Sequence, residues 1–218
     1  MTWDWDYAWA VLPILLGGLR VTLTLTLLGS LLALTLGLAL AVARRSQRRL
    51  VSIPTALAID LIRSTPLLIQ LYFLFYVLPF YGMTLSAFTT GVLGIGLHYA
   101  TYASEAYRAG IESVPAGQWD AARSLGFGPV AQWRSVLIPQ VYRASIPPLG
   151  NYMVGMFKDT AIVSAITTTE LFRSAMNESG RTFRYVEPLT FVALLFLAVS
   201  LPAAWLVKCA ERRLARSV

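Results

Sequence analysis

Two adjacent charged residues, Lys158 and Asp159, are the first candidates for binding chemistry, because they lie in an otherwise largely apolar stretch. A charge at the centre of a membrane costs at least ~2.5 kcal/mol on insertion scales, so a neighbouring pair needs partners or a function. Adjacent residues on a helix point about 100° apart, so the two are not expected simply to pair with each other. Lys158 could bind a carboxylate while Asp159 holds another helix, or the reverse. Alternatively, both pair with neighbouring helices.

A second group of polar candidates lies on other apolar segments. Arg63 could clamp a carboxylate or pair with Asp159, and a third interpretation is that its side chain reaches the membrane surface. His98, Tyr102 and Glu105 recur at helical spacing and therefore share one face. Such a face suits a solute pathway, but it also suits a buried helix contact, which is the commoner situation for a lone histidine. The candidates for a substrate pathway are Lys158, Asp159, Arg63, His98, Tyr102 and, more weakly, Gln70.

No arrangement typical of a catalytic site is found in the sequence. The Gly-x-x-x-x-Gly-Lys-Ser/Thr loop that binds nucleotide phosphates is absent. One histidine and one cysteine, Cys209, argue against a metal site and exclude an intrachain disulfide. We therefore expect neither an enzyme nor a chain with its own cofactor. If ATP and magnesium supply the energy, a partner chain must bind them.

The composition is typical of a membrane protein. Hydrophobic residues make up 56% of the chain. Charged residues make up 13%, against roughly 25% in soluble domains. The formal net charge is +7, but the basic residues cluster at the ends of apolar runs, which indicates membrane topology rather than nucleic-acid binding. We expect one all-α membrane domain over residues 1–218, with no nucleic-acid partner.

Five membrane-spanning helices are expected from the apolar runs. They cover residues 12–43, 53–80, 85–108, 144–168 and 188–207. Basic clusters follow the first and last runs and assign both of these ends to the cytoplasm. The clusters are Arg44, Arg45, Arg48 and Arg49, and then Lys208, Arg212, Arg213 and Arg216. The N-terminus is therefore expected outside and the C-terminus inside, with no cleavable signal peptide.

Local features predict how these spans are arranged. Small residues fall four apart on one face of the first span and would let another helix approach closely, although a chance distribution would look the same. They are Gly29, Ala33 and Gly37. The fourth span carries prolines, glycines and two charges, so we expect it at the centre of the assembly. Residues 167–187 are polar and are expected outside the membrane, with a short helix near residues 170–176.

The polar segment between the third and fourth spans, residues 112–139, has the signals of a helix, a tight turn and a second short helix. Pro115 suits the first turn of a helix, Gly126 suits the left-handed residue that ends it, and Pro129 suits the start of the next. Ile138-Pro139 is expected to stop or kink the chain.

The first of these two helices has a thin side formed by Ala121 and Ala122, next to the charges of Asp120 and Arg123. A thin side lets the backbone of another protein approach closely, so the shape suits a peg that enters a groove in a partner. A solvated loop between spans is the alternative, and the residues alone leave both interpretations open.

The spacing of Asp120-Ala121-Ala122, Gly126, Val136 and Ile138-Pro139 resembles the cytoplasmic coupling signature of ABC importer permeases. That signature has Glu at the position of Asp120, Ile at that of Val136 and Leu at that of Ile138. Each departure keeps the charge or the apolar character. Four further motifs resemble the polar amino acid branch of the same family, and the resemblance covers nearly the whole chain. They are Pro115-Ala-Gly-Gln-Trp, Arg63-Ser-Thr-Pro, Lys158-Asp-Thr and Thr182-Phe-Arg.

The resemblance implies the type I ABC importer permease fold in a bacterial inner membrane, with a coupling helix between the third and fourth spans. It also implies the partners, which are two ATPase subunits, a second permease subunit, an extracytoplasmic solute-binding protein and membrane lipid. The residues that would contact the ATPase are Asp120, Ala121, Ala122, Gly126, Ile138 and Pro139.

For the solute, the resemblance implies a polar amino acid or a similar zwitterion, and cations near aromatic side chains suit such a molecule. General amino-acid permeases are expected to have asparagine in place of His98. The run from His98 to Tyr102 looks closer to permeases for ectoine and hydroxyectoine.

Two other functional classes are considered. An ion-gradient transporter would need an inverted repeat and its own proton or sodium site, and neither is visible. A non-transporting membrane scaffold could bind cytoplasmic proteins through the same peg. Copurification with an ATPase and a second permease would favour the importer over both. No role is assigned to Arg20, Asp60 or Cys209.

Overall fold

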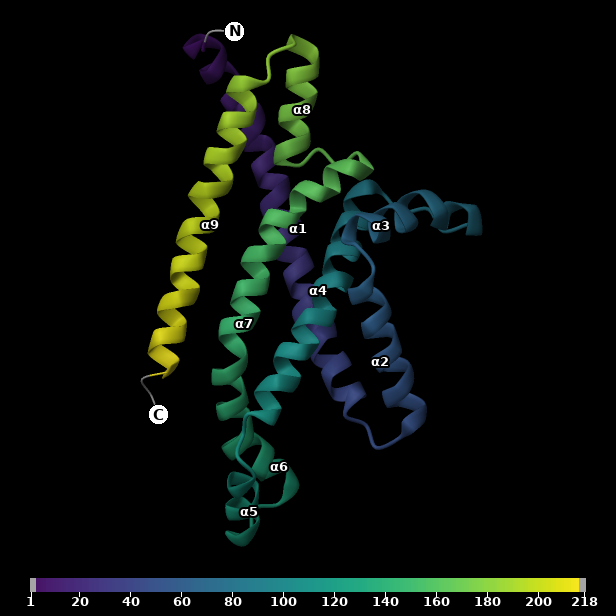
Figure 1. Cartoon of the computed structure of the whole chain (residues 1–218), viewed down its shortest axis with the longest axis vertical. Helices are drawn as coiled ribbons and strands as arrows, with labels where there is room; N and C mark the ends of the chain where they lie inside the picture. The colour runs from purple at the N-terminus through teal and green to yellow at the C-terminus, as the bar shows by residue number, and fades with distance from the viewer. Residues whose placement is uncertain (1–2, 216–218) are drawn as a thin grey trace.

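The computed structural model describes residues 3–215 as a bundle of helices, with no strand among them. The long helices α1, α4 and α7 pack at its centre, and α9 lies along α7 and part of α1 (Figure 1). The α-helices are α1 (Trp5–Arg44), α2 (Arg49–Ser64), α3 (Leu67–Tyr72), α4 (Ala87–Glu112), α5 (Ala116–Ser124), α6 (Pro129–Gln132), α7 (Ile138–Asp159), α8 (Leu171–Thr182) and α9 (Val186–Ala215). Two π-helical turns, η1 (Phe73–Val77) and η3 (Trp133–Leu137), and two 3-10 turns, η2 (Leu78–Tyr81) and η4 (Thr160–Ile166), connect them. Arg216 of the predicted terminal basic cluster falls outside the described residues.

The most extensive contact between two helices joins α1 to α4. Gly29, Ala33 and Gly37 are all buried along it. A side-chain carbon at Gly37 would lie 2.7 Å from Cβ of Ala103 and 2.9 Å from the backbone oxygen of Ala100. A larger residue would therefore push the two helices apart. The predicted role of this small-residue face in close helix packing is confirmed.

The segment predicted as a span over residues 53–80 is sharply bent. α2 ends at Ser64, and the helical segment Leu67–Tyr81 continues at 104° to it, as a broken span or a re-entrant loop. The cause is Pro66, which disfavours helical backbone at the residue before it. Thr65 accordingly has extended backbone, with φ −105° and ψ 131°.

Ile138-Pro139 begins a helix, and the predicted stop is not found. The turn η3 runs directly into α7, which starts at Ile138 and has Pro139 in its first turn. The turn before it is π-helical, with the Ile138 N–H bonded to the Trp133 oxygen, so the missing N–H of Pro139 falls where the ordinary helical pattern is already interrupted. α7 therefore begins before residue 144, where the fourth span is predicted to start.

Within residues 3–215, two helices, α1 and α9, are long and apolar enough to cross a membrane, and α2 with Leu67–Tyr81 can be counted as a bent third. α4 and α7 are long enough, but their composition is too polar for the same assignment. α4 buries polar residues such as Thr101 and Ser104 among the other helices. α7 packs against α1, α4 and α9, and its predicted position at the centre of the assembly stays a prediction.

The helix predicted near residues 170–176 is present and continues to Thr182 as α8. Its N-cap, Glu170, accepts hydrogen bonds from two backbone N–H groups of the first turn. The N–H of Leu171 donates to Thr22 Oγ1 over 3.1 Å. α8 is thereby fixed to the side of α1.

Asp4, Arg184 and Glu187 form what we call the N-terminal clasp, which joins the start of α1 to the start of α9. Arg184 donates to Asp4 Oδ2 over 2.8 Å and to Glu187 Oε1 over 2.7 Å, and the Asp4 N–H donates to the same Glu187 oxygen over 3.1 Å. The N–H of Tyr7, together with the Arg184 side chain, holds the pKa of the Asp4 carboxyl below its ordinary value.

Candidate functional site

Polar side chains from four helices converge close to the break between α2 and α3. Arg63 comes from the last turn of α2, Gln70 from α3, His98 and Tyr102 from α4, and Asp159 from the end of α7. These are five of the six residues predicted for a substrate pathway, and contacts between neighbouring side chains join them into one group. We call this group, with Tyr99, the central cluster.

Gln70 connects the bend to the histidine. Its side-chain nitrogen donates to the backbone oxygens of Ile62 over 2.7 Å and Thr65 over 2.8 Å, and it lies 3.1 Å from His98 Nδ1. The Gln70 amide nitrogen has two hydrogens for these three acceptors, so at least two of the contacts share one hydrogen. His98 therefore makes a hydrogen-bonded contact between helices, as one of the two interpretations of its face requires.

Asp159 is held by Tyr99, a residue that the sequence does not single out. The Tyr99 hydroxyl donates to Asp159 Oδ2 over 2.8 Å and connects α4 to the end of α7. The ring centre of Tyr102 lies 6.0 Å from that of Tyr99, 5.2 Å from that of His98 and 5.7 Å from that of Tyr152. The central cluster therefore combines a carboxylate with several aromatic faces.

Arg63 supplies the cation of the cluster, and it contacts Tyr102 and Glu105. Its guanidinium carbon lies 5.1 Å from the centre of the Tyr102 ring, and Nη1 lies 3.7 Å from Glu105 Oε1. The interpretation that pairs Arg63 with Asp159 is wrong, because the face of α4 that carries Tyr102 and Glu105 receives the end of α2. Asp159 is engaged by Tyr99 instead.

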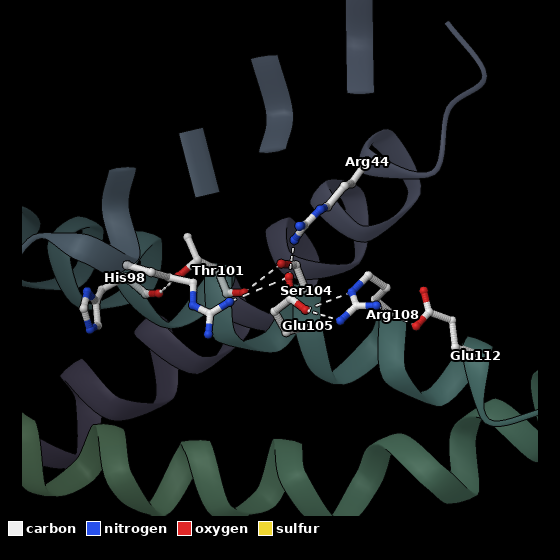
Figure 2. A network of polar contacts seen from close by, with 8 residues as sticks. Arg44, His98, Thr101, Ser104, Glu105, Arg108 and Glu112 are labelled. Atoms are coloured by element: carbon white, nitrogen blue, oxygen red, sulfur yellow. Dashed lines mark hydrogen bonds and ion pairs between the residues drawn. The ribbon is translucent and has the colours of Figure 1, made fainter. Parts of the chain in front are cut away.

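Glu105 is the centre of an ion-pair network, shown in Figure 2. Arg44 at the end of α1 donates to Oε1, and Arg108 Nε and Nη2 each lie 2.8 Å from Oε2. Arg108 also lies 2.6 Å from Glu112. One carboxylate therefore ties together α1, α2 and α4. We call these residues (Arg44, Arg63, Glu105, Arg108 and Glu112) the Glu105 network.

Lys158 and Asp159 occupy different surroundings, as expected for adjacent residues on a helix. Asp159 is half-buried beside Tyr99, whereas Lys158 is exposed. Lys158 is therefore the one predicted pathway residue that the structure does not join to the central cluster. Its binding of a carboxylate stays a prediction.

The predicted peg, α5 with α6, projects beyond the ends of the long helices (Figure 1). Trp119 and Trp133 hold it together with ring centres 5.4 Å apart, and the side chain of Gln132 donates to the Trp119 oxygen over 2.8 Å. Gly126 has φ +77°, which confirms the predicted left-handed residue. Backbone hydrogen bonds from the N–H groups of residues 126 and 127 to carbonyls of α5 close the end of the helix.

The surface of the peg differs from the prediction in one respect. Ala122 is only 3% exposed and is covered by its own chain, so it cannot form part of an open thin side. Asp120 and Ala121 are exposed. Leu125 and Val130, which the sequence does not single out, are 76% and 80% exposed near the turn. A projecting tip with exposed apolar side chains is typical of an interaction surface.

The chain matches the family described as "Binding-protein-dependent transport system inner membrane component" over residues 33–216. It is 41% identical to a probable amino-acid ABC transporter permease protein of Sinorhizobium fredii, over 96% of this chain and 93% of that protein. It is 36% identical to the L-cystine transport system permease protein TcyB of Bacillus subtilis, over 94% and 88%. Identity to the glutamine transport system permease protein GlnP of Escherichia coli is 30%, over 98% and 99%.

Solved structures share the fold. A crystal structure of an amino acid ABC transporter with histidines has a chain that is 36% identical, with a TM-score of 0.92 over 98% of this chain and 100% of that one. An inward-facing structure of the MetNI methionine ABC transporter has a TM-score of 0.76 at 16% identity, over 92% and 96%. The arrangement of helices described above is therefore shared with transporter subunits of low sequence identity.

Proposed function

This chain belongs to the family of binding-protein-dependent transport system inner membrane components, and on that premise we propose that it is the permease subunit of an ATP-driven importer of amino acids or amino-acid-like zwitterions. The observation that carries the solute class is the central cluster, where a guanidinium, a carboxylate and aromatic faces converge. Members of the family are transport components, so the chain is not an enzyme, and ATP is hydrolysed on a partner.

The proposed topology has five spans in a bacterial inner membrane, formed by α1, the bent α2 with Leu67–Tyr81, α4, α7 and α9. The lengths of α4, 26 residues, and α7, 22 residues, support this count, because about 20 residues cross the hydrocarbon core. Basic residues at the end of α1 and in the last turn of α9 support a cytoplasmic position for those ends and an N-terminus outside.

The peg is proposed to couple this chain to the ATPase subunits. Its exposed Asp120 and Ala121, with the apolar Leu125, would enter the partner's groove. Because η3 continues without a break into α7 at Ile138 and Pro139, a force on the peg acts directly on the helix that ends at Asp159. Closure of the ATPases on ATP would thus move the carboxylate of the central cluster.

Two further partners are proposed, a second permease subunit and an extracytoplasmic solute-binding protein. A second permease is supported by the poor enclosure that one bundle gives a hydrophilic path, with Lys158 exposed at the end of α7. The solute-binding protein is supported by the description of the family.

Within the proposed solute class, Arg63 or Lys158 would bind the carboxylate, and Asp159 with the aromatic rings would bind the cationic part. Ectoine and hydroxyectoine are candidates beside glutamine and cystine, which are named for relatives of this chain. The candidate status of ectoine rests on His98 and its neighbouring sequence.

Coupling is tested by Gly126→Val in the complex reconstituted in liposomes with its ATPase and second permease. A β-branched residue cannot adopt φ +77° without strain, so uptake should fall at least about ten-fold while ATP hydrolysis continues. Gly117→Val, on α5 with nothing within 4 Å, is the matched control and should keep uptake. Full uptake by the Gly126→Val complex would count against a coupling role.

The solute site is tested by Arg63→Met and Lys158→Met, with Arg49→Met as a control at the exposed start of α2. Uptake of L-glutamine, L-cystine, L-arginine and ectoine is measured with the cognate binding protein, and assembly by size-exclusion chromatography. Loss of uptake with intact assembly is expected for Arg63→Met and Lys158→Met only. If the complex falls apart instead, the two cations have a structural role.

A further inference from the structure

Arg63 is held more loosely than the other two arginines that surround Glu105. Arg44 and Arg108 make direct hydrogen bonds to its carboxylate, whereas the nearest approach of Arg63 is 3.7 Å. Access to solvent does not explain the difference, because the side chains of Arg63 and Arg108 are 37% and 35% exposed. The difference lies in the bonding of each guanidinium.

Glu105 does not depend on Arg63 for its neutralisation. Arg44 bonds one of its oxygens and Arg108 bonds the other. If Arg63 moves away, the carboxylate keeps both of these partners. The departure of Arg63 therefore costs little, since a long and partly exposed ion pair contributes little to stability.

Arg63 already contacts an aromatic ring of the central cluster. Its guanidinium rests against the ring of Tyr102, and that ring also contacts His98 and Tyr99. Tyr99 in turn bonds Asp159. A guanidinium that slides over Tyr102 thus stays on an aromatic surface and reaches the region where a zwitterionic solute would place its carboxylate.

We propose that Glu105 is a positioning residue whose carboxylate, fixed by Arg44 and Arg108, tethers Arg63 beside Tyr102 as an exchangeable cation that transfers to the carboxylate of the solute. This inference rests on the proposed function, in which Arg63 contacts the solute. In the empty site Glu105 stands in for the solute carboxylate. It keeps the cation in place while the firm ion pair with Arg44 holds α1 and α4 together and the pair with Arg108 fixes the carboxylate on α4.

The tether is tested without transport, by the rate at which phenylglyoxal modifies each arginine in the purified complex, read by mass spectrometry. Arg63 should react at least about three-fold faster than Arg108, which is equally exposed but firmly bonded. Glu105→Gln should accelerate Arg63 further. Glu112→Gln, the matched control, should accelerate Arg108 alone. Equal rates for Arg63 and Arg108, or an Arg63 rate unchanged by Glu105→Gln, would overturn the proposal.

If Glu105→Gln does not assemble, Glu105→Asp replaces it. The shorter side chain keeps its charge for the arginines that bond it directly but withdraws from the partner that is already 3.7 Å away. The Arg63 rate should then rise while the rates of Arg44 and Arg108 stay within about two-fold of the unmodified protein. A rise at all three arginines would show that no single one is exchangeable.

Transfer to the solute is tested by the Kd of the purified complex for L-glutamine, L-cystine, L-arginine and ectoine. Glu105→Gln should tighten binding about two- to five-fold, because the solute no longer competes with Glu105 for Arg63. In the Arg63→Met background the same change should leave Kd unaltered. An unchanged Kd in the single variant overturns the transfer. Normal binding and uptake by Arg63→Met would instead refute the proposed solute site, and the phenylglyoxal rates would still decide on the tether.

Discussion

The Glu105 network and the N-terminal clasp are both built from arginines and carboxylates, but arginines outnumber carboxylates in the network and carboxylates outnumber arginines in the clasp. In the clasp one arginine, Arg184, bridges two carboxylates, and Glu187 is buried with a side chain only 3% exposed. In the network three arginines surround Glu105, and Arg63 makes the one long contact. The clasp has no cation to spare, whereas the network has one.

The difference follows from what each region holds together. The clasp joins the beginnings of α1 and α9, and its guanidinium reaches both carboxylates over 2.7–2.8 Å. The network joins α1, α2 and α4 beside a cluster that is proposed to receive a charged solute. An excess of positive charge is costly in a closed protein, but it is useful where a ligand brings the missing carboxylate. A surplus cation beside a cluster of aromatic rings is therefore a sign of function, and a clasp whose single cation is fully engaged is a sign of structure.

The largest effect is expected when α1, which contributes to both regions, is forced away from a helix packed against it. Gly37→Leu would place a side chain against Ala100 and Ala103 of α4, and Gly18→Leu would place one 2.9 Å from Cα of Leu171 in α8. Each should destabilise the protein by at least about 1–3 kcal/mol, the first more, since α1 and α4 share the most extensive contact. Gly17→Leu, with open space around it, is the control. The yield of monodisperse protein and the midpoint of thermal unfolding measure the outcome.

Removal of one arginine from each region tests the comparison directly. Arg184→Gln leaves the buried Glu187 and Asp4 without their shared cation, so the midpoint of thermal unfolding should fall by several degrees. Arg63→Gln leaves Glu105 with two firm partners, so the midpoint should change by less than about 2 °C. Equal losses in the two variants would mean that Arg63 is as structural as Arg184.

The clasp should also respond to acid. Because the pKa of Asp4 in the folded protein lies below its ordinary value of about 4, its charge stabilises the fold above that pH. The stabilisation is lost as the pH falls through the folded-state pKa. Between about pH 6 and pH 3, the midpoint of thermal unfolding should therefore fall more in the native protein than in Asp4→Asn. Asp6→Asn, on the same turn of α1, should behave like the native protein.

The smallest effect is expected at the rim of the network. Glu112 is exposed and bonds Arg108 four residues away on the same helix. Such pairs contribute about 0.3–0.5 kcal/mol and are screened by salt. Glu112→Gln should therefore leave the unfolding midpoint almost unchanged at high ionic strength. A large loss would mean that Arg108 depends on Glu112 rather than on Glu105.

Local signals in the sequence predicted local structure well. Gly126 adopts the predicted left-handed backbone, and the small residues of α1 allow the close approach of α4. Both predictions depend on what one residue or one helix face permits. The break after α2 also had a signal, the proline at position 66, but the apolar composition on both sides of it favoured a single span.

The sequence alone determined the membrane-spanning helical class, the peg with its turn, and the set of polar candidates. Composition, helical spacing and the backbone limits of glycine and proline do not depend on distant residues. The partners were decided by the tertiary structure. Arg44, which the sequence assigns to membrane topology, became a partner of Glu105, and Ala122 was covered by its own chain. Which helix meets which depends on the packing of the whole bundle, and a charged side chain bonds whatever that packing brings within reach.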